Sequence, residues 1–238
     1  MVLWKKMKLV RFQPWVGKNC HVGFNGLRTL VLGESHYHSL NNPEINDSPN
    51  ETIECIQEQV EGGWTKAFWT KIAIALTGRT PTTTDKEQFW DSVAFYNYVQ
   101  ESAGFGPRVR PSPKSWEMSK VPFEEVLEQL KPDFIVALGY RLWDMLPDLN
   151  GREGPKIEST PQPRTWIYPH SGGCALLFNV KHPSSGFSPP EWHKHILVAQ
   201  EKAKDVLKKA CLIGCKGFWT HTFFRKRGGS TVPARWCN

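Results

Sequence analysis

Residues 29–33, Thr-Leu-Val-Leu-Gly, are the stretch that decides the fold of this 238-residue chain. The run is short and apolar and ends at a glycine, which is the pattern of a buried parallel strand that enters a loop. Similar runs follow at 133–139 and at 174–180. Because helical patterns separate these strands, the sequence predicts an α/β fold: a three-layer sandwich with a central, mostly parallel sheet covered on both faces.

The rest of the chain divides into one main domain and two flanking segments. We expect an irregular N-terminal arm at 1–26, the α/β domain at 27–210 and a basic C-terminal tail at 211–238 that packs on the domain. Within the domain the patterns predict helices at 51–61, 66–76, 85–90, 123–130, 141–146 and 191–207, a short strand at 93–98 and a proline-rich loop at 107–122.

Composition narrows the class of protein. No apolar run approaches the roughly 20 residues of a membrane-spanning helix, and the lysine-rich start lacks the features of a secretory signal. We therefore expect a cytoplasmic protein without a membrane partner, and a monomer. The six cysteines are scattered without zinc-knuckle spacing, which favours free thiols. A net charge of +7 favours a polyanionic partner such as DNA.

Polar residues follow three of the predicted strands. Residues 33–38, Gly-Glu-Ser-His-Tyr-His, come after the first strand, Asn97 lies on the short strand, and residues 182–185, His-Pro-Ser-Ser, follow the third apolar run. Ligands of open α/β sheets bind at the carboxyl ends of the strands, where such loops converge. These three segments are therefore expected to form one site.

The chemistry of these residues suits the breaking of an N-glycosidic bond. Such a reaction needs a base held in a pocket, a positioned water and stabilisation of the departing base anion. The carboxylate of Glu34 could accept a hydrogen bond from the water and face a cationic sugar. The amide of Asn97 could pair with a base edge, and His182 could donate to a base oxygen.

The order of these motifs resembles the uracil-DNA glycosylase superfamily over roughly residues 27–207. The Gly-Glu start of 33–38 is similar to the Gly-Glu-Ala-Pro-Gly loop of the thermophile-type enzymes, and Tyr37 with His38 resembles the end of the Gly-Gln-Asp-Pro-Tyr-His loop of the most widespread enzymes. The segment 180–184, Val-Lys-His-Pro-Ser, is similar to the family's His-Pro-Ser motif.

The resemblance implies roles for individual residues. His182 would stabilise the leaving base, Phe187 would fill the gap in the helix after flipping, and an early aromatic, Phe68 or else Trp64, would stack on the base. The predicted catalytic residues are Glu34 and His182; the base-binding residues are Asn97, Phe68, Tyr37, Ser35 and His36; the DNA-binding residues are Lys181, Ser184, Ser185 and Phe187.

The chain departs from the family pattern at several positions. His36 stands where family loops usually have Pro, and Ser35 stands where the widespread enzymes have Asp. Thermophile-type enzymes use four cysteines for an iron–sulfur cluster, whereas here Cys20 is alone near the N-terminus and 97–131 has none. We expect no iron–sulfur cluster, no metal and no other cofactor. A site of His36 and His38 with His170 or His193 lacks carboxylate or cysteine partners at a telling spacing.

Each of these residues also has a structural explanation. Glu34 could be an ordinary loop residue, His182 could cap a strand end, and Asn97 could satisfy backbone groups in a turn. Tyr37 could close the pocket beside C5 of the base or simply pack. Phe68 and Trp69 have helical spacing with Ile72, so at least one of them is expected in the core.

The sequence thus predicts a monofunctional DNA glycosylase that leaves an abasic site. Its substrate would be uracil or another deaminated base in repair, or a bulky glucosylated hydroxymethylcytosine of phage DNA in antiviral defence. The second class of function is a non-catalytic module that binds damaged or modified DNA, and the third is an enzyme of free nucleosides that shares the fold.

Overall fold

The computed structural model describes residues 6–37, 48–61, 66–80, 82–106 and 109–213. Within these ranges seven strands form one mixed sheet in the order β1-β3-β2-β4-β7-β6-β5. The strands are β1 (Trp15–Val16), β2 (Thr29–Gly33), β3 (Val93–Asn97), β4 (Phe134–Leu138), β5 (Arg152–Glu153), β6 (Thr165–His170) and β7 (Gly173–Val180).

The four central strands, β3, β2, β4 and β7, run parallel to one another. Their registers pair Gly33 with Asn97 and Leu138 with Val180, so the carboxyl ends of all four strands lie at the same edge of the sheet. The outer strands β1, β6 and β5 are antiparallel to their neighbours. This arrangement brings the loops after β2, β3, β4 and β7 to one edge.

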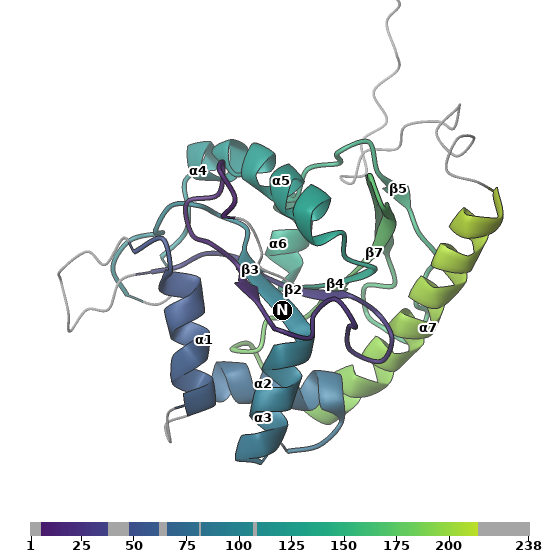
Figure 1. Cartoon of the computed structure of the whole chain (residues 1–238), viewed down its shortest axis with the longest axis horizontal. Helices are drawn as coiled ribbons and strands as arrows, with labels where there is room; N and C mark the ends of the chain where they lie inside the picture. The colour runs from purple at the N-terminus through teal and green to yellow at the C-terminus, as the bar shows by residue number, and fades with distance from the viewer. Residues whose placement is uncertain (1–5, 38–47, 62–65, 81, 107–108, 214–238) are drawn as a thin grey trace, which may run out of the picture.

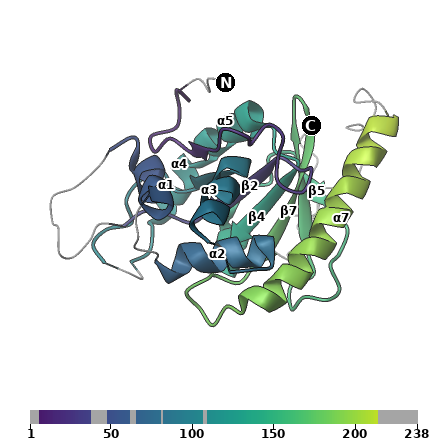
Figure 2. The ribbon, with the colours of Figure 1, turned by 60° about the horizontal axis from the view of Figure 1, so that its bottom comes forward.

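Helices cover both faces of the sheet and make three layers (Figures 1 and 2). The helices are α1 (Glu51–Glu61), α2 (Ala67–Thr77), α3 (Thr83–Ser92), α4 (Pro113–Met118), α5 (Lys120–Leu130), α6 (Tyr140–Met145) and α7 (Pro189–Ile213). One core lies between the sheet and α1, α2, α3 and α7, and a second lies between the sheet and α4, α5 and α6. The prediction of a three-layer α/β fold with a mostly parallel centre is confirmed.

Successive side chains of the central strands point alternately into the two cores. Val31 of β2 belongs to the core under α2 and α7, while its neighbours Leu30 and Leu32 belong to the core under α5. All three side chains are 0% exposed. A strand whose residues are apolar on both faces can only lie inside such a sandwich, and this explains why 29–33 predicts the fold so directly.

The prediction of a loop over 107–122 is wrong, because α4 and the start of α5 lie there. Pro113 stands at the beginning of α4 and Pro122 in the first turn of α5. The first-turn N–H groups of a helix have no partner within the helix, so proline loses nothing there and its fixed φ suits the helix.

Several other elements differ from the predicted ones, mainly toward the two ends of the described chain. Residues 15–16 of the predicted irregular arm form β1, which pairs with β3. Helix α7 has 25 residues and begins before and ends after the predicted 191–207. Strands β5 and β6 are additional to the prediction. The tail from residue 214 onward, on which the prediction of a packed basic segment falls, lies outside the described residues.

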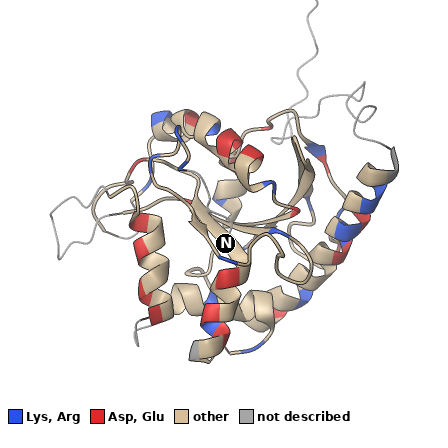
Figure 3. Cartoon of the chain, viewed as in Figure 1, with Lys and Arg blue, Asp and Glu red and all other residues tan. Residues whose placement is uncertain are grey.

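Charged residues lie mainly on the helices and loops, whereas the four central strands carry none (Figure 3). Helix α1 carries acidic residues and no Lys or Arg, whereas α7 carries both signs of charge. Among the described helices, none combines the length and the apolar composition that crossing a membrane requires.

Arg28 and Asp133 join the starts of β2 and β4, at the edge of the sheet opposite the converging loops. The guanidinium donates from Nη2 to Oδ1 at 2.7 Å and from Nε to Oδ2 at 3.0 Å, and the backbone N–H of Arg28 also donates to Oδ2 at 2.9 Å. The backbone N–H of Asp133 returns a bond to the carbonyl of Arg28 at 2.8 Å. A bidentate pair of this kind fixes geometry as well as adding energy.

Replacing Asp133 by Ala is expected to lower the free energy of unfolding by about 1–3 kcal/mol, since three hydrogen bonds to a charged group are lost in a partly buried setting. Urea denaturation measures the loss. The control is Glu153→Ala, which breaks an exposed Arg164–Glu153 pair with an N–O distance of 3.5 Å and should cost less than about 1 kcal/mol. Equal effects from the two variants would contradict the assignment.

Candidate functional site

The polar residues predicted to converge do lie along one edge of the sheet. Asn97 ends β3, Glu34 directly follows β2, and His182 lies two residues beyond β7. Strand β4 separates β2 from β7. With strands spaced about 4.8 Å apart, the backbones of Glu34 and His182 are separated by roughly two strand spacings, about 10 Å.

Two glycines allow this edge to be compact. Gly139 follows β4 with a φ of 120°, a conformation that side chains rarely adopt, and a Cβ there would lie 3.5 Å from Cβ of His182. At Gly33 the backbone is ordinary, but a Cβ would overlap Oδ1 of Asn97. A larger residue at Gly33 would therefore require the Asn97 amide to move.

His182 is a half-buried imidazole whose Nδ1 has a backbone hydrogen-bond partner. The backbone N–H of Ser184 donates to its Nδ1 at 3.2 Å, so Nδ1 is an acceptor and the proton of the neutral ring is on Nε2. Burial lowers the pKa of His182 below its usual 6.5, and the positive charge of Arg110 lowers it further. At neutral pH the ring therefore offers an N–H donor at Nε2 without a charge.

Phe68 of α2 lies beside His182, with a distance of 5.5 Å between ring centroids and 37° between the ring planes. The next residue, Trp69, points into the core against Trp90 and Phe95. Of the two adjacent aromatics, Trp69 is the core residue, and Phe68 is the one that the structure brings to the predicted site.

Two hydrogen bonds hold the loop after β7, one within the loop and one from α2. The N–H of Ser185 donates to the carbonyl of His182 at 2.9 Å, and Nζ of Lys71 in α2 donates to the carbonyl of Pro183 at 2.9 Å. Ser184 and Ser185 are exposed. Nζ of Lys181 would lie 3.4 Å from a Cβ on Gly186, so this ammonium group also belongs to the loop.

Phe187 does not fit the predicted role of an inserting wedge. Its side chain is 6% exposed and stacks on Trp192 of α7, with 9° between the ring planes and 5.8 Å between centroids. A wedge must present its ring to solvent, whereas Phe187 anchors the loop to α7. We therefore do not retain it among DNA-contacting residues.

Asn97 is buried, and its amide faces His36 rather than a turn. Nδ2 lies 3.0 Å from Nε2 of His36, and the two side chains are 8% and 7% exposed. His36 also contacts Thr52 and Glu51 of α1. His36 is thus buried against Asn97 and α1 in this structure, and its contact with a base stays a prediction.

The loop that carries Glu34 is held by backbone hydrogen bonds to the chain after β3. The N–H groups of Tyr98, Val99 and Ala103 donate to the carbonyls of Gly33, Glu34 and His36 at 3.0, 2.9 and 2.9 Å respectively. Glu34 and Ser35 are half-buried, and Tyr37 is 53% exposed. The carboxylate is therefore carried on a fixed backbone at the rim of the sheet.

Three further predictions concern a metal site, the cysteines and residues that lie outside the described ranges. Within the described part of the chain no three His, Cys, Asp or Glu side chains gather as a metal site would require. Burial raises the pKa of the Cys20 thiol to about 11, so it is not poised as a nucleophile. His38 and the alternative stacking residue Trp64 lie outside the described residues.

Four residues near the site escaped the sequence analysis: Lys71, Arg110, Glu51 and Thr52. Lys71 had a usable signal, because it lies three residues after Phe68 and so on the same face of a helix. Arg110 lies in the stretch that the sequence predicts as a proline-rich loop. Glu51 and Thr52 open a helix, where acidic and hydroxyl residues are common for capping reasons alone.

A comparison with protein-family models finds no match to this chain. A comparison with curated proteins finds no match either.

Replacing Gly33 by Ala is expected to displace the Asn97 amide and to lower the free energy of unfolding by about 1–3 kcal/mol through overpacking. Side-chain amide resonances of Asn97 and urea denaturation report the two effects. The control is Gly172→Ala, where the nearest atom is the flexible Cδ of Lys131, so the Asn97 resonances should stay in place. An unshifted Asn97 resonance in a folded Gly33→Ala protein would contradict the geometry.

His182 is expected to titrate below 6.5 in an NMR experiment, because burial and Arg110 both disfavour its charged form. Arg110→Ala removes a positive charge, so the pKa of His182 should rise. Arg164→Ala removes a positive charge that is not among the causes of the His182 shift and should leave the titration in place. A midpoint at or above 6.5 in the unmodified protein would mean that the ring is not buried as described.

Proposed function

We propose that this protein is a DNA glycosylase of the uracil-DNA glycosylase type, which flips a nucleotide out of DNA and hydrolyses its N-glycosidic bond. The observation that carries the proposal is the position of His182, whose Nδ1 accepts from the backbone of Ser184, on the same sheet edge as Asn97 and Glu34. This set provides a donor for a leaving base, an amide for a base edge and a carboxylate for a water.

In the proposed reaction the oxygen of water bonds to C1′ of the sugar while the bond from C1′ to the base nitrogen breaks. The electron pair of that bond leaves with the base. The carboxylate of Glu34 accepts a hydrogen bond from the water and faces the positive charge that develops on the sugar. The proton lost by the water ends on the departing base or in solvent, and the DNA keeps an abasic site.

His182 would act by stabilising negative charge on a carbonyl oxygen of the base. A neutral donor suits this task, because the N–H strengthens its hydrogen bond as charge develops and needs no prior protonation. Phe68 lies against the His182 ring. An aromatic at that position gives a flipped base a flat surface on which to stack.

The charges near the site favour an approach by a polyanion. Lys71 and Lys181 belong to or contact the loop after β7, and the charge of Arg110 reaches His182. Ser184 and Ser185 are exposed on the same loop and could donate to phosphate oxygens. The chain as a whole carries a net charge of +7.

The test is an abasic-site assay on three DNAs: one containing uracil, an unmodified phage DNA and a phage DNA with glucosylated hydroxymethylcytosine. Glu34→Gln and His182→Ala are each expected to slow cleavage by about 10²–10⁴-fold. Glu58→Gln and His21→Ala change exposed residues of the same kinds, and these variants should cleave at the unmodified rate.

Cleavage of uracil DNA alone would mean a repair enzyme, and cleavage of the glucosylated DNA alone would mean defence against phage. Tight DNA binding without an abasic product on any substrate would refute the enzymatic proposal in favour of a binding module. Activity confined to free nucleosides would indicate the third class of function.

A further inference from the structure

A cavity of about 300 Å³ lies between α7 and the antiparallel edge of the sheet. Residues of β5, of β6 and of the turn after β5 form its wall on the sheet side, and residues of the C-terminal half of α7 form the opposite wall. The first α7 residue in this wall is Lys202, which lies thirteen residues after Pro189, about 20 Å along the helix. Because α7 begins just beyond the loop that carries His182, the cavity is well separated from the candidate site.

The floor of the cavity is apolar. Ile167 of β6 and Val206 of α7 line it from opposite sides, together with Pro155. Helix α7 packs closely on the sheet at Ala199 and Ala203, which are 0% exposed, whereas Val206 is only partly buried. The helix thus covers the sheet less completely toward its C-terminal end, and the cavity lies where that cover ends.

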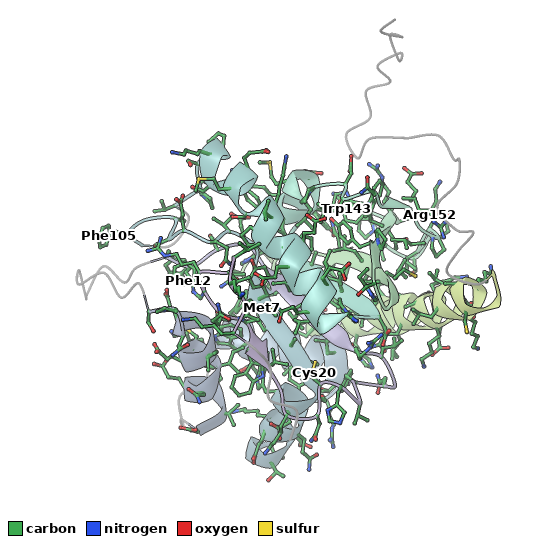
Figure 4. All side chains as sticks on the ribbon, turned by 45° about the horizontal axis from the view of Figure 1, so that its top comes forward. Met7, Phe12, Cys20, Phe105, Trp143 and Arg152 are labelled. Atoms are coloured by element: carbon green, nitrogen blue, oxygen red, sulfur yellow. The ribbon has the colours of Figure 1, made fainter. Side chains whose placement is uncertain are left out.

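Charged side chains surround this apolar floor. Lys202, Asp205 and Lys209 follow one another at spacings of three and four residues, so they share one face of α7. Arg152 of β5 pairs across the strands with Ile167, and paired residues lie on the same face of a sheet. Ile167 belongs to the core under α7, so Arg152 lies on the face that α7 covers. Figure 4 shows Arg152 on the same side of the molecule as the C-terminal half of α7.

Positive charge exceeds negative charge in the cavity. One arginine and two lysines bring three positive charges, and Asp205 brings one negative charge. Glu153 also lines the cavity, but its carboxylate lies 3.5 Å from Nη2 of Arg164. In the described part of the chain, the ammonium groups of Lys202 and Lys209 form no ion pair or hydrogen bond. The excess of two positive charges matches the charge of a phosphate monoester, which is about −1.5 to −2 at neutral pH.

The guanidinium of Arg152 is half-buried at the sheet side of the cavity. Burial lowers the pKa of Arg152, because it removes part of the charged group from water. An arginine nevertheless stays protonated at neutral pH, and its planar group can donate two parallel hydrogen bonds to one phosphate. An anion in the cavity would therefore stabilise a charge that the fold has partly desolvated.

We propose that this cavity is a binding site for a small phosphate monoester of about the size of one nucleotide. Arg152 binds the phosphate from the sheet side, and Lys202 and Lys209 add positive charge from α7. The apolar floor takes the face of the attached organic group. A volume of about 300 Å³ is at the lower end for small-molecule sites, so the cavity suits a single nucleotide rather than a DNA strand.

The first arm of the test titrates the full chain with adenosine 5′-monophosphate and with adenosine, and follows the backbone amides by ¹⁵N NMR. The nucleotide is expected to shift the amides of Gly154 and Val206 in a saturable way. Adenosine should bind at least about tenfold more weakly, because it lacks the negative charges. Equal affinities for the two compounds, or no saturable shift at these amides, would overturn the proposal.

The second arm removes the lysines. Lys202→Gln combined with Lys209→Gln changes two exposed helix positions, so the fold should be kept, and the affinity for adenosine 5′-monophosphate should fall about tenfold. Lys194→Gln combined with Lys208→Gln removes the same charge from exposed positions of α7 outside the cavity. This matched control should bind as the unmodified protein does. An unchanged affinity in the first pair, or an equal loss in both pairs, would contradict the site.

The third arm distinguishes a free phosphorylated molecule from the phosphates of DNA. Inorganic phosphate should compete with adenosine 5′-monophosphate at the amides of Gly154 and Val206, whereas a short unmodified DNA duplex should not. Displacement of the nucleotide by the duplex would assign the cavity to a DNA-binding surface and overturn the proposal. All three arms measure binding without cleavage, so their results do not depend on whether the protein has the proposed glycosylase activity.

Discussion

The parallel register of β2, β4 and β7 is the constraint on which the rest of the structure depends. Arg28 and Asp133 lock the starts of β2 and β4 by side-chain and backbone bonds, and the N–H of Leu176 in β7 donates to the carbonyl of Asp133. A shift of one residue would exchange the two faces of every strand and move the strand ends relative to each other. The relative positions of the site residues therefore depend on these hydrogen bonds at the opposite edge of the sheet.

Much of the fold could be predicted from the sequence, because strands buried on both faces have unmistakable composition. Strands β2, β4 and β7 and the convergence of Glu34, Asn97 and His182 follow from that rule. Helix α4 could not be predicted, since its prolines resemble loop residues unless their place in the first turn is known. The burial of Phe187 and the contact of His36 with Asn97 depend on packing between distant segments, which no local pattern records.

Two imidazoles near the sheet edge have different neighbours. The backbone N–H of Ser184 donates to Nδ1 of His182, so the proton of the neutral ring is on Nε2. His36 lies instead in a buried polar cluster with Thr52, Glu51 and Asn97. The same residue type is thus half-buried on a loop in one place and enclosed by polar side chains in the other.

The order of the site residues along the chain has a consequence for how the protein matures. Glu34 and His182 stand roughly 150 residues apart, a separation that makes their meeting a late event in folding. During synthesis the sheet edge stays incomplete until β7 has left the ribosome and inserted beside β4. Nascent chains therefore lack the assembled sheet edge until nearly the whole domain has been made.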